Sequence, residues 1–344
     1  MTKASPKSGR YPEGGLLHEI LTIFHGRGEG EVVSGEELSG LLRISRTAVW
    51  KHIKALKEMG YAITAEPSRG YRLAGTPDLL IPEEVGRDLG VRRVGSRIVS
   101  FRETGSTNEV AYRLAEEGAD EGTVVLADAQ TKGKGRLGRE WASPPAVNLY
   151  CSLILRPPLP PYAAPQLTFL SAVAVARAIE ENSHLLPRIK WPNDLLINER
   201  KVAGLLNEMS AETDHVNFVI LGIGVNLNMA EDQFPTGLRH PATSLFIESG
   251  SRINRTRFVR SLLKSLDSLY DTYLKAGDGP IREEWLSRSR MAGERVRVVQ
   301  QDREVTGRVT GVDGFGALLV LDERGEEHRV LSGDVKILGL GTGD

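Results

Sequence analysis

Residues 133–139 read GKGRLGR, and Trp141 follows shortly after them. Glycine lets the backbone approach a ligand closely and adopt positive φ without a steric penalty. The cations between the glycines are Lys134, Arg136 and Arg139, and arginine can bind phosphate or carboxylate bidentately. The segment is therefore typical of a loop that closes over an anionic ligand, although a Gly/Arg loop taken alone is also explained by a flexible surface turn.

Two common nucleotide-binding patterns do not fit this loop. The phosphate loop GxxxxGK[ST] ends in a Lys-Ser/Thr pair, which is missing here. The pattern GxGxxG opens a helix, whereas Trp141, Pro144 and Pro145 follow this loop at once. The sequence also shows no GxSxG motif and no cluster of His, Asp and Glu residues at metal-ligand spacing. We therefore expect neither a covalent enzyme intermediate nor a metal site built by the protein.

Further motifs flank the loop in a fixed order. Ser106-Thr107-Asn108 and Gln130 precede it, and KWPND (190–194), KVAG (201–204) and GIGVN (222–226) follow it. With this ordered set in view, the chain resembles the biotin–protein ligase family. Its N-terminal region resembles the bifunctional members that also act as the biotin operon repressor. The resemblance covers nearly the whole chain, and the ordered set is much more specific than any single motif.

The resemblance implies a biotin–[acetyl-CoA-carboxylase] ligase with two half-reactions. Biotin carboxylate attacks the α-phosphate of ATP, and a lysine of the biotin carboxyl carrier protein then attacks the resulting biotinyl-5′-AMP. The first step brings two anions together, so cations must neutralise them and fixed donors must meet the developing charge. The anhydride hydrolyses readily, so the site must exclude water. Biotin and ATP are the expected substrates, and Mg²⁺ is expected on the ATP phosphates rather than in a protein cage.

The resemblance also implies which residues bind the two substrates. Ser106 and Gln130 would offer a hydroxyl and an amide to the ureido end of biotin, although Ser106-Thr107-Asn108 is also an ordinary helix start. The expected biotin-binding residues are Ser106, Thr107, Asn108, Gln130, Lys134, Gly135, Arg136 and Lys190. The expected ATP- or adenylate-binding residues are Gly133, Arg136, Arg139, Lys190 and Asn226.

Lys190 and Arg136 are the expected catalytic residues. Lys190 ends a strand-like run just before a proline turn, where a fixed ammonium would neutralise carboxylate and phosphate during attack. The alternative for Lys190 is a surface ion pair with Asp194, which would be worth little. Arg136 would hold the adenylate phosphate. Lys134 stands where the family commonly has arginine, and Leu137 where it often has another basic residue, so this loop is less cationic.

Other residues of the motifs keep two interpretations. Asn193 and Asp194 could position nucleotide or Mg²⁺, but the turn that they form could equally need their polar side chains as caps. Lys201 is a candidate for a second positive charge near the phosphates. Trp141 either packs against the closed loop or anchors it. The glycines of GIGVN are expected where a strand presses against the ligand.

The elements before residue 76 predict a winged helix-turn-helix. An amphipathic helix starts within 14–30, Ser34 with Glu37 predicts the start of a short helix, and residues 46–59 form a basic helix that Gly60 ends. Two strand-like runs around 67–70 then predict a hairpin. The basic helix would lie in the major groove, unless its charges are simply a solvated face. The expected DNA contacts are Arg46, Thr47, Trp50, Lys51, Lys54 and Arg69.

The whole pattern predicts a multidomain α+β protein. We expect a flexible tail over 1–13, the winged helix-turn-helix over 14–75 and, after a linker, a biotin/ATP-binding ligase domain over 83–290. The ligase domain is expected to be class II synthetase-like, with a mixed sheet and helices on one side. Short strands separated by Gly and Asp turns predict an SH3-like barrel over 291–344.

Composition narrows the setting. The formal net charge is −1, but residues 1–75 carry +3 and the remainder −4, so a nucleic-acid surface should be N-terminal. The single cysteine, Cys151, excludes an intrachain disulfide and a thiolate metal cluster, and it lies in a run typical of a buried strand. No apolar run reaches the ~18–20 residues that span a bilayer, and no signal peptide is visible. We therefore expect a cytoplasmic protein without a membrane partner.

Two alternatives to the bifunctional ligase stay open. One is a ligand-sensing transcription factor whose ligase-like domain binds without turnover, against which Lys190 together with Arg136 argues. The other replaces biotin by lipoate or another acyl acid, whereas the Ser106 and Gln130 pair favours biotin. A ligand-promoted homodimer is expected, because dimers suit palindromic operator half-sites. The operator sequence, the dimer affinity and the retention of repression do not follow from the sequence.

Overall fold

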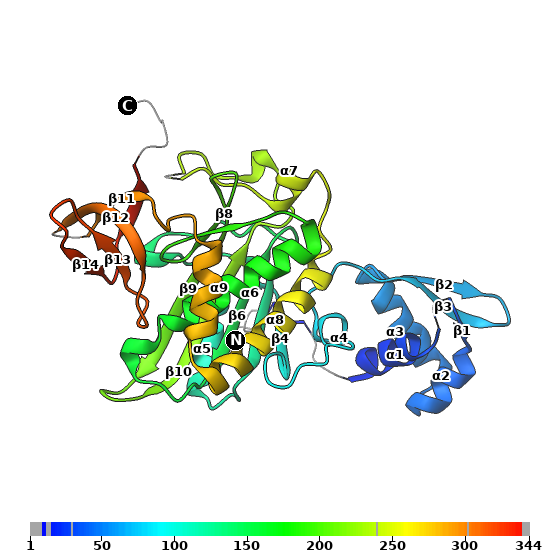
Figure 1. Cartoon of the computed structure of the whole chain (residues 1–344). Helices are drawn as coiled ribbons and strands as arrows, with labels where there is room; N and C mark the ends of the chain where they lie inside the picture. The colour runs from blue at the N-terminus through cyan, green and yellow to red at the C-terminus, as the bar shows by residue number, and fades with distance from the viewer. Residues whose placement is uncertain (1–8, 12–14, 29, 239, 301–302, 339–344) are drawn as a thin grey trace, which may run out of the picture.

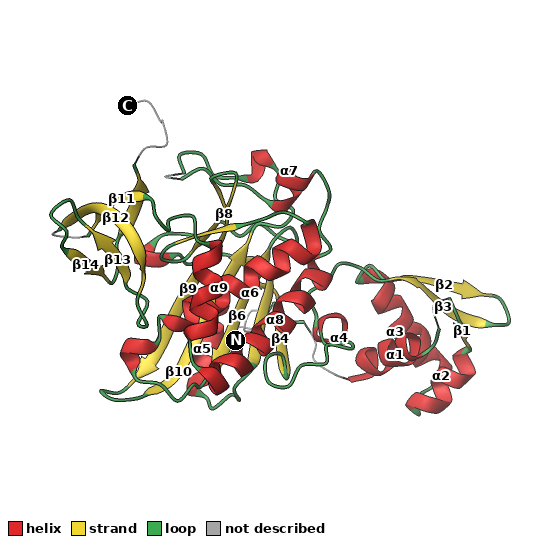
Figure 2. Ribbon diagram, in the orientation of Figure 1, coloured by secondary structure: helices red, strands yellow, loops and turns green. Residues whose placement is uncertain are grey.

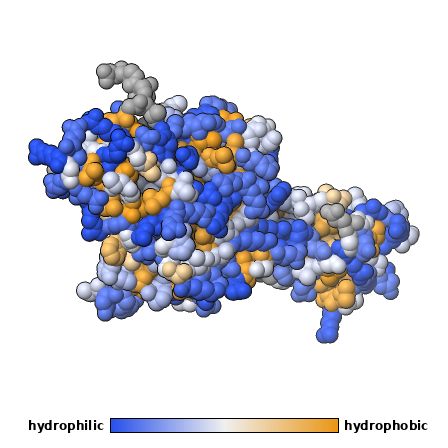
Figure 3. Space-filling view, viewed as in Figure 1, coloured by the Kyte–Doolittle hydropathy of each residue, from blue (hydrophilic) through white to orange (hydrophobic). Residues whose placement is uncertain are grey.

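The computed structural model describes residues 9–11, 15–28, 30–238, 240–300 and 303–338. Figure 1 shows three groups of elements: an N-terminal lobe, a central body built on a large sheet, and a C-terminal β module. The N-terminal lobe and the β module lie at opposite ends of the body. The space-filling view in Figure 3 shows the N-terminal lobe as a protrusion that a narrower region joins to the body.

The N-terminal lobe is the predicted winged helix-turn-helix. Its sheet has the order β1-β3-β2, and side-chain hydroxyls cap two of its helices: Ser34 accepts from Glu37 N at 3.0 Å, and Ser45 accepts from Ala48 N at 3.2 Å. The strand β1 escaped prediction because it has only two residues. The elements are α1 (Gly15–Gly26), β1 (Val32–Val33), α2 (Gly35–Leu42), α3 (Arg46–Glu58), β2 (Ala62–Glu66) and β3 (Gly70–Gly75).

Residues 9–11 correct the expectation of a flexible tail over 1–13. Tyr11 N donates to Ser100 O at 2.9 Å, and Arg102 N donates to Gly9 O at 2.6 Å. The Tyr11 side chain is buried, with only 5% of its surface exposed. The segment therefore pairs with strand β4 (Arg97–Thr104) of the central body, and the rest of 1–13 lies outside the described residues.

The linker after β3 is also packed against its neighbours. It contains the short helix α4 (Pro82–Val85), and Ile81 belongs to the apolar core of the N-terminal lobe. Glu84 is buried and accepts hydrogen bonds from Tyr61 Oη at 2.8 Å and from His25 Nε2 at 3.1 Å. Burial alone would raise the pKa of Glu84, but the bonds from His25 and Tyr61 outweigh it and lower the pKa. The ionised Glu84 carboxylate thus binds two side chains of the N-terminal lobe and attaches the lobe to the linker.

The central body contains a seven-stranded sheet of order β4-β5-β6-β10-β9-β8-β7. β4 and β5 are parallel and the other neighbours are antiparallel, as the prediction of a mixed sheet requires. Its other strands are β5 (Thr123–Gln130), β6 (Leu149–Leu155), β7 (Arg188–Lys190), β8 (Asp194–Ile197), β9 (Arg200–Ala211) and β10 (Val216–Val225). Its helices are α5 (Thr107–Glu116), α6 (Gln166–Ser183), α7 (Leu245–Ser249), α8 (Arg255–Ala276) and α9 (Gly279–Arg288). Three 3₁₀ turns complete it: η1 (Arg136–Gly138), η2 (Pro161–Ala163) and η3 (Glu231–Gln233).

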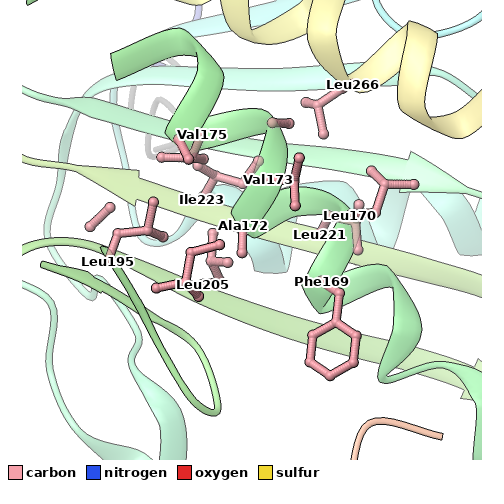
Figure 4. Close-up of a cluster of buried hydrophobic side chains, with 14 of the residues drawn as sticks. Phe169, Leu170, Ala172, Val173, Val175, Leu195, Leu205, Leu221, Ile223 and Leu266 are labelled. Atoms are coloured by element: carbon pink, nitrogen blue, oxygen red, sulfur yellow. The ribbon is translucent and has the colours of Figure 1, made fainter. Parts of the chain in front are cut away.

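Helices cover both faces of this sheet. The expected layer on one side consists of α6, α8 and α9, which Figure 2 shows stacked in front of the strands. Figure 4 shows its core, with Leu170 and Val173 of α6 packed over Leu221 and Ile223 of β10. Against the prediction, α5 packs on the other face, where alternate residues of β4, β5, β6 and β10 form a smaller apolar cluster.

The segment Pro161–Ser183 corrects the expectation that no apolar run reaches membrane-spanning length. By length and composition alone this segment could cross a membrane, but 72% of its most apolar 18-residue stretch is buried inside the protein. The core helix of a folded protein can be equally long and apolar, and α6 supplies the centre of the apolar core described above. The segment is therefore weak evidence for a membrane span.

The C-terminal module is a five-stranded antiparallel sheet of order β14-β13-β12-β11-β15. Its turn at Gly316 contacts the central body, because Trp191 Nε1 donates to Gly316 O at 3.0 Å. β15 reaches the central body as well, through side-chain contacts described below. The strands are β11 (Arg295–Val299), β12 (Glu304–Val312), β13 (Leu318–Leu321), β14 (Glu327–Val330) and β15 (Asp334–Ile337).

Candidate active site

A cavity of about 340 Å³ collects nearly all the predicted site residues. It lies between the glycine loop, the start of α5, the strands β9 and β10, the KWPND turn and the edge of β15. The predicted residues that line it are Ser106, Thr107, Asn108, Gln130, Lys134, Gly135, Arg136, Arg139, Lys190 and Asn226. Segments far apart in the sequence therefore meet at one site.

The glycine loop folds into a small flap over this cavity. Gly135 N donates to Arg139 O at 2.6 Å, and Trp141 N donates to Gly133 O at 2.9 Å. Gly138, at the tip, has a φ of 72°, which glycine adopts without strain. The flap is thus a hydrogen-bonded hairpin with a glycine at its bend.

Trp141 anchors the flap to the sheet, which decides between its two interpretations. Its ring lies so close to β9 and β10 that a Cβ on Gly204 or Gly224 would fall 2.8 or 2.7 Å from ring atoms. The Nζ of Lys201 lies 5.4 Å from the ring centroid, within range of a cation–π contact. The two glycines therefore make room for the indole.

Two other glycines also have packing roles. Gly222 and Gly224 of GIGVN both line the cavity, and a Cβ on Gly222 would lie 2.3 Å from Asn108 Oδ1, so these glycines also make room for side chains. Gly133 is absent from the lining of the cavity, against its predicted contact with ATP. A Cβ there would lie 2.3 Å from Trp141 O, so Gly133 lets the two arms of the flap close.

We expect Gly224→Ala to weaken biotin binding about tenfold, because overpacking costs roughly 1–3 kcal/mol and would displace Trp141. Titration calorimetry with biotin measures this effect. Gly40→Ala is the matched control, since a Cβ at Gly40 meets nothing within 4 Å. Unchanged biotin affinity in Gly224→Ala would show that the position of Trp141 does not matter for binding.

Three cations of the site are paired with carboxylates. Lys134 Nζ lies 2.9 Å from Glu109 Oε1, and Lys201 Nζ lies 2.6 Å from Asp194 Oδ1. Arg139 Nη2 donates to both oxygens of Asp334 in β15, at 3.0 and 2.9 Å. Arg139, predicted to position ATP phosphates, therefore ties the flap to the C-terminal module in this structure.

Lys190 and Arg136 are different. Neither side chain has a hydrogen bond or an ion pair to any residue that the structure describes, and the expected alternative partner of Lys190, the Asp194 carboxylate, is paired with Lys201. Both are half-buried at the cavity, and burial lowers the pKa of each. The two predicted catalytic residues are thus cations that face the cavity without a counter-ion.

The start of α5 and the end of β5 form a polar wall of the cavity. Gln130 Oε1 accepts from Thr107 N at 2.8 Å, and Gln130 Nε2 donates to Ser143 Oγ at 3.0 Å. Asn108 Nδ2 donates to Glu208 Oε2 at 2.7 Å, and its Oδ1 is taken up by Ser152. Ser106 is buried, and its hydroxyl has no hydrogen-bond partner within the described ranges.

The remaining motif residues are mainly held by the protein. Asn226 Nδ2 donates to Thr243 O at 3.0 Å, and its Oδ1 accepts from Asn148 at 3.4 Å, so the amide is engaged at both ends. Asn193 Nδ2 donates to Leu205 O at 2.6 Å, which ties the KWPND turn to β9. Cys151 is buried, and burial raises the pKa of its thiol to about 12.

Sequence reasoning missed three parts of the wall. An apolar floor and the loop after β10 carry no recognisable motif, and the edge of β15 comes from another module. Asp334 reaches the flap only because the folded C-terminal module places the edge of β15 beside the cavity. These residues are Tyr150, Leu206, Met229, Phe234, Leu238, Gly333, Asp334 and Val335.

The predicted DNA-contacting face is exposed in the N-terminal lobe. Trp50 has 54% of its surface exposed, and Lys54 Nζ lies 5.8 Å from its ring centroid. Arg46 and Arg69 are each paired with a carboxylate, on Glu36 and Glu66 respectively, at 2.8 Å. Lys51 and Thr47 of α3 are also exposed.

Asp322, Glu326 and His328 form a group of possible metal ligands, although the sequence predicted no metal site. It lies at the β13–β14 turn, away from the cavity. Asp322 accepts hydrogen bonds from His328 Nε2 at 2.9 Å and from the backbone of Arg324 and Glu326. These bonds lower the pKa of Asp322 to about 2, so the carboxylate already stabilises the turn.

Three protein-family models match this chain, one for each of the three groups of elements. The HTH domain model matches residues 20–72, the Biotin/lipoate A/B protein ligase family model matches 100–226, and the Biotin protein ligase C terminal domain model matches 292–338.

Named relatives match over nearly their whole length. The Bifunctional ligase/repressor BirA of Bacillus subtilis is 38% identical over 94% of this chain and 98% of its own length. That of Escherichia coli is 29% identical over 90% of this chain and 94% of its own length. The solved biotin protein ligase from Aquifex aeolicus in complex with biotin and ATP superposes with a TM-score of 0.60. It is 31% identical and covers 70% of this chain and 98% of that one.

Proposed function

This chain belongs to the family of bifunctional biotin–protein ligases and biotin operon repressors, and on that premise we propose how its own residues carry out the two activities. As a biotin–[acetyl-CoA-carboxylase] ligase it activates biotin with ATP to biotinyl-5′-AMP and transfers biotin to a lysine of the carrier protein. As a DNA-binding repressor it controls biotin genes. The observation that carries the site assignment is the pair of cations without counter-ions, Lys190 and Arg136, in the cavity that collects the family motifs.

Lys190 and Arg136 neutralise the two anions of the first half-reaction. The carboxylate of biotin and the α-phosphate of ATP repel each other, and attack adds charge to the phosphoryl oxygens. Lys190 and Arg136 need not break an existing ion pair to meet that charge, whereas Lys134, Lys201 and Arg139 would have to. Half-burial strengthens the attraction, because water screens it less.

The polar wall supplies the site for the ureido end of biotin. Ser106 offers a hydroxyl without a partner, and Gln130 is held in a fixed orientation by Thr107 and Ser143. Thr107 and Asn108 line the same part of the cavity, and their hydrogen bonds also hold this wall together. The adenylate side is formed by Lys190 and by Arg136 and Arg139 of the flap. Asn226 forms part of the floor there, and its amide is fixed by hydrogen bonds within the protein.

The flap protects the anhydride until the acceptor lysine arrives. Its fastening to β15 by Arg139 and to β9 and β10 by Trp141 closes the cavity from two sides. Exclusion of water slows hydrolysis and strengthens the charge interactions inside. The amine of the carrier lysine then attacks the acyl carbon, and AMP leaves.

Mg²⁺ would be bound mainly by the ATP phosphates and water rather than by side chains of this protein. The residues fit this arrangement, because two of the three carboxylates that line the cavity, Asp194 and Asp334, are already paired with a cation, and the third, Glu140, is exposed. Mg²⁺ would add positive charge on the β- and γ-phosphates, where pyrophosphate departs.

The two activities are assigned to separate parts of the chain. We place DNA binding in residues 14–75, the ligase in 83–290 and the SH3-like module in 291–344. Operator DNA and the carrier protein are the partners, and an adenylate-promoted homodimer would match a two-fold operator. A cytoplasmic location follows from these partners.

A ligation assay tests the enzymatic function. The protein is incubated with ATP, Mg²⁺, labelled biotin and a purified carrier domain, and the carrier is expected to become labelled. Absence of label, with biotin still bound, would identify a sensor without turnover. Competition by lipoate at equal concentration would overturn the choice of biotin.

A gel shift on DNA upstream of biotin-synthesis genes tests the repressor function. We expect retardation that increases with biotin and ATP, and we expect Lys51→Ala to weaken binding about equally for all sequences, as loss of a phosphate contact does. Trp50→Ala should reduce discrimination between sequences, because α3 is assigned to the major groove. Lys264→Ala, an exposed lysine on α8, is the matched control. Equal retardation of every DNA fragment by all variants would contradict the assignment of α3.

A further inference from the structure

Arg255, the first residue of α8, is a buried arginine outside the active site, with 1% of its surface exposed. Its Nη1 donates to Asp128 Oδ1 in β5 at 2.8 Å, and its Nη2 donates to the backbone oxygen of Asp78 at 2.6 Å. Its Nε lies 3.3 Å from Asp78 Oδ2. A buried charge is retained at low cost only when it is paired and hydrogen-bonded, and Arg255 meets that condition with two carboxylates.

Asp78 lies in the chain that leaves the DNA-binding lobe. Its Oδ1 accepts from Thr256 N at 3.1 Å, so the same side chain caps the first turn of α8 and pairs with Arg255. Asp78 therefore attaches the segment that leaves the lobe, the exit segment, to α8 of the ligase domain. We call this attachment a mount.

Asp128 holds the chain that enters the lobe. Tyr11 Oη donates to Asp128 Oδ2 at 2.6 Å, while Asp128 Oδ1 accepts from Arg255. Burial and the bond to Asp128 raise the pKa of Tyr11, so its hydroxyl stays protonated and donates. The Arg255 guanidinium thus binds the exit segment directly at Asp78 and is connected to the entry segment through Asp128.

The same residues adjoin the floor of the cavity. Arg255 Nη1 lies 3.5 Å from Asn148 O, and Asn148 Oδ1 accepts from Leu227 N at 3.0 Å. Asn148 Nδ2 donates to Asn226 Oδ1 at 3.4 Å and to Met229 Sδ at 3.2 Å, and both of these residues line the cavity. A continuous chain of polar contacts therefore joins the adenylate side of the site to the mount.

We propose that Arg255 is a positioning residue that helps to fix the DNA-binding lobe to the ligase domain through two contacts, Tyr11–Asp128 and Asp78, which add to those of Glu84 with the lobe, and that it links this mount to the floor of the active site. The inference rests on the proposed function, since it gives the lobe a set orientation for operator binding. Each of these contacts narrows the range of orientations that the lobe can adopt on the ligase domain, so loss of both should widen that range. Ligand that orders the floor would then bias the orientation of the lobe.

The test loosens both mounts without burying an unpaired charge. The double variant Tyr11→Phe, Asp78→Asn removes the hydroxyl bond and the carboxylate partner but keeps the shape of both side chains. The matched control is Tyr162→Phe, Asp88→Asn, because Tyr162 is 66% exposed, Asp88 is exposed, and neither side chain has a hydrogen-bond partner among the described residues. Spin labels on Leu41→Cys and Glu116→Cys report the distance between lobe and ligase domain, and the sole native cysteine, Cys151, is buried.

We expect a narrow distance distribution in the parent and control proteins and a clearly broader one in the double variant. Carrier biotinylation should be within about twofold of the parent in all three, while stimulation of DNA retardation by biotin and ATP should fall about fivefold or more in the double variant. An unchanged distance distribution would overturn the proposal. A broadened distribution with no DNA binding even in the parent would leave the mount standing and refute the repressor function instead.

Discussion

Lys190→Ala is expected to slow formation of biotinyl-adenylate about 10³-fold, roughly 4 kcal/mol of transition-state stabilisation. The reason is that Lys190 is a half-buried ammonium with no counter-ion in the described structure, so its charge is available to the reacting anions. Pyrophosphate release in a single turnover measures the step. Lys201→Ala is the matched control: Lys201 lies at the same cavity but is paired with Asp194, and its loss should cost much less.

The pH dependence of the same step gives a second readout. Burial lowers the pKa of Lys190, and the neighbouring Lys201 lowers it further, while Asp194 opposes this. Since the charged form is the active one, adenylate formation should decline on the alkaline side at a lower pH than the pKa of an ordinary lysine. An alkaline limb that persists unchanged in Lys190→Ala would remove this lysine from the mechanism.

The sequence predicted which cations reach the site but not which of them are free. Lys134, Arg136, Arg139 and Lys190 were all placed at the site by motif, and all four line the cavity. The carboxylate that holds Arg139 is almost two hundred residues away, in a module whose sequence shows only strand alternation. Pairing depends on tertiary approach, which no local pattern encodes, so the division into paired and unpaired cations required coordinates.

The prediction of glycine roles was limited for the same reason, because the group that contacts a glycine is also set by tertiary structure. A glycine motif indicates that something approaches the backbone, and at Gly224 and Gly133 something does. The groups within the protein that approach them are the ring of Trp141 at Gly224 and its backbone oxygen at Gly133. Sequence alone cannot distinguish a ligand from a side chain that packs in the same place.

The fold was predicted where periodicity is long and lost where elements are short. α3 has a clear apolar face, and it was expected over 46–59, within one residue of its bounds. β1 and α4 have too few residues to show a period. Tyr11 was missed for another reason: a single aromatic in a polar segment has no pattern, and its burial depends on Asp128 from a distant strand.

Arg136→Gln is expected to let biotinyl-adenylate escape about 10- to 100-fold faster, because charge-assisted hydrogen bonds contribute roughly 1.5–3 kcal/mol each. Arg136 lies on the 3₁₀ turn of the flap, and no described carboxylate is within ion-pair distance of it. Glutamine keeps a donor and much of the length but loses the charge and the bidentate fork. The dissociation rate is measured by diluting enzyme loaded with labelled adenylate into excess unlabelled biotin and ATP.

Arg139→Gln separates phosphate binding from flap closure. Arg139 is tied to Asp334, so its loss should loosen the flap and speed hydrolysis of bound adenylate, and Asp334→Asn should do the same. Arg136→Gln should instead release intact anhydride, which would label free amines in solution without the carrier. If Arg136→Gln released adenylate at the parent rate while both latch variants released it rapidly, the flap would retain the intermediate by closure alone and Arg136 would have no part in holding the phosphate.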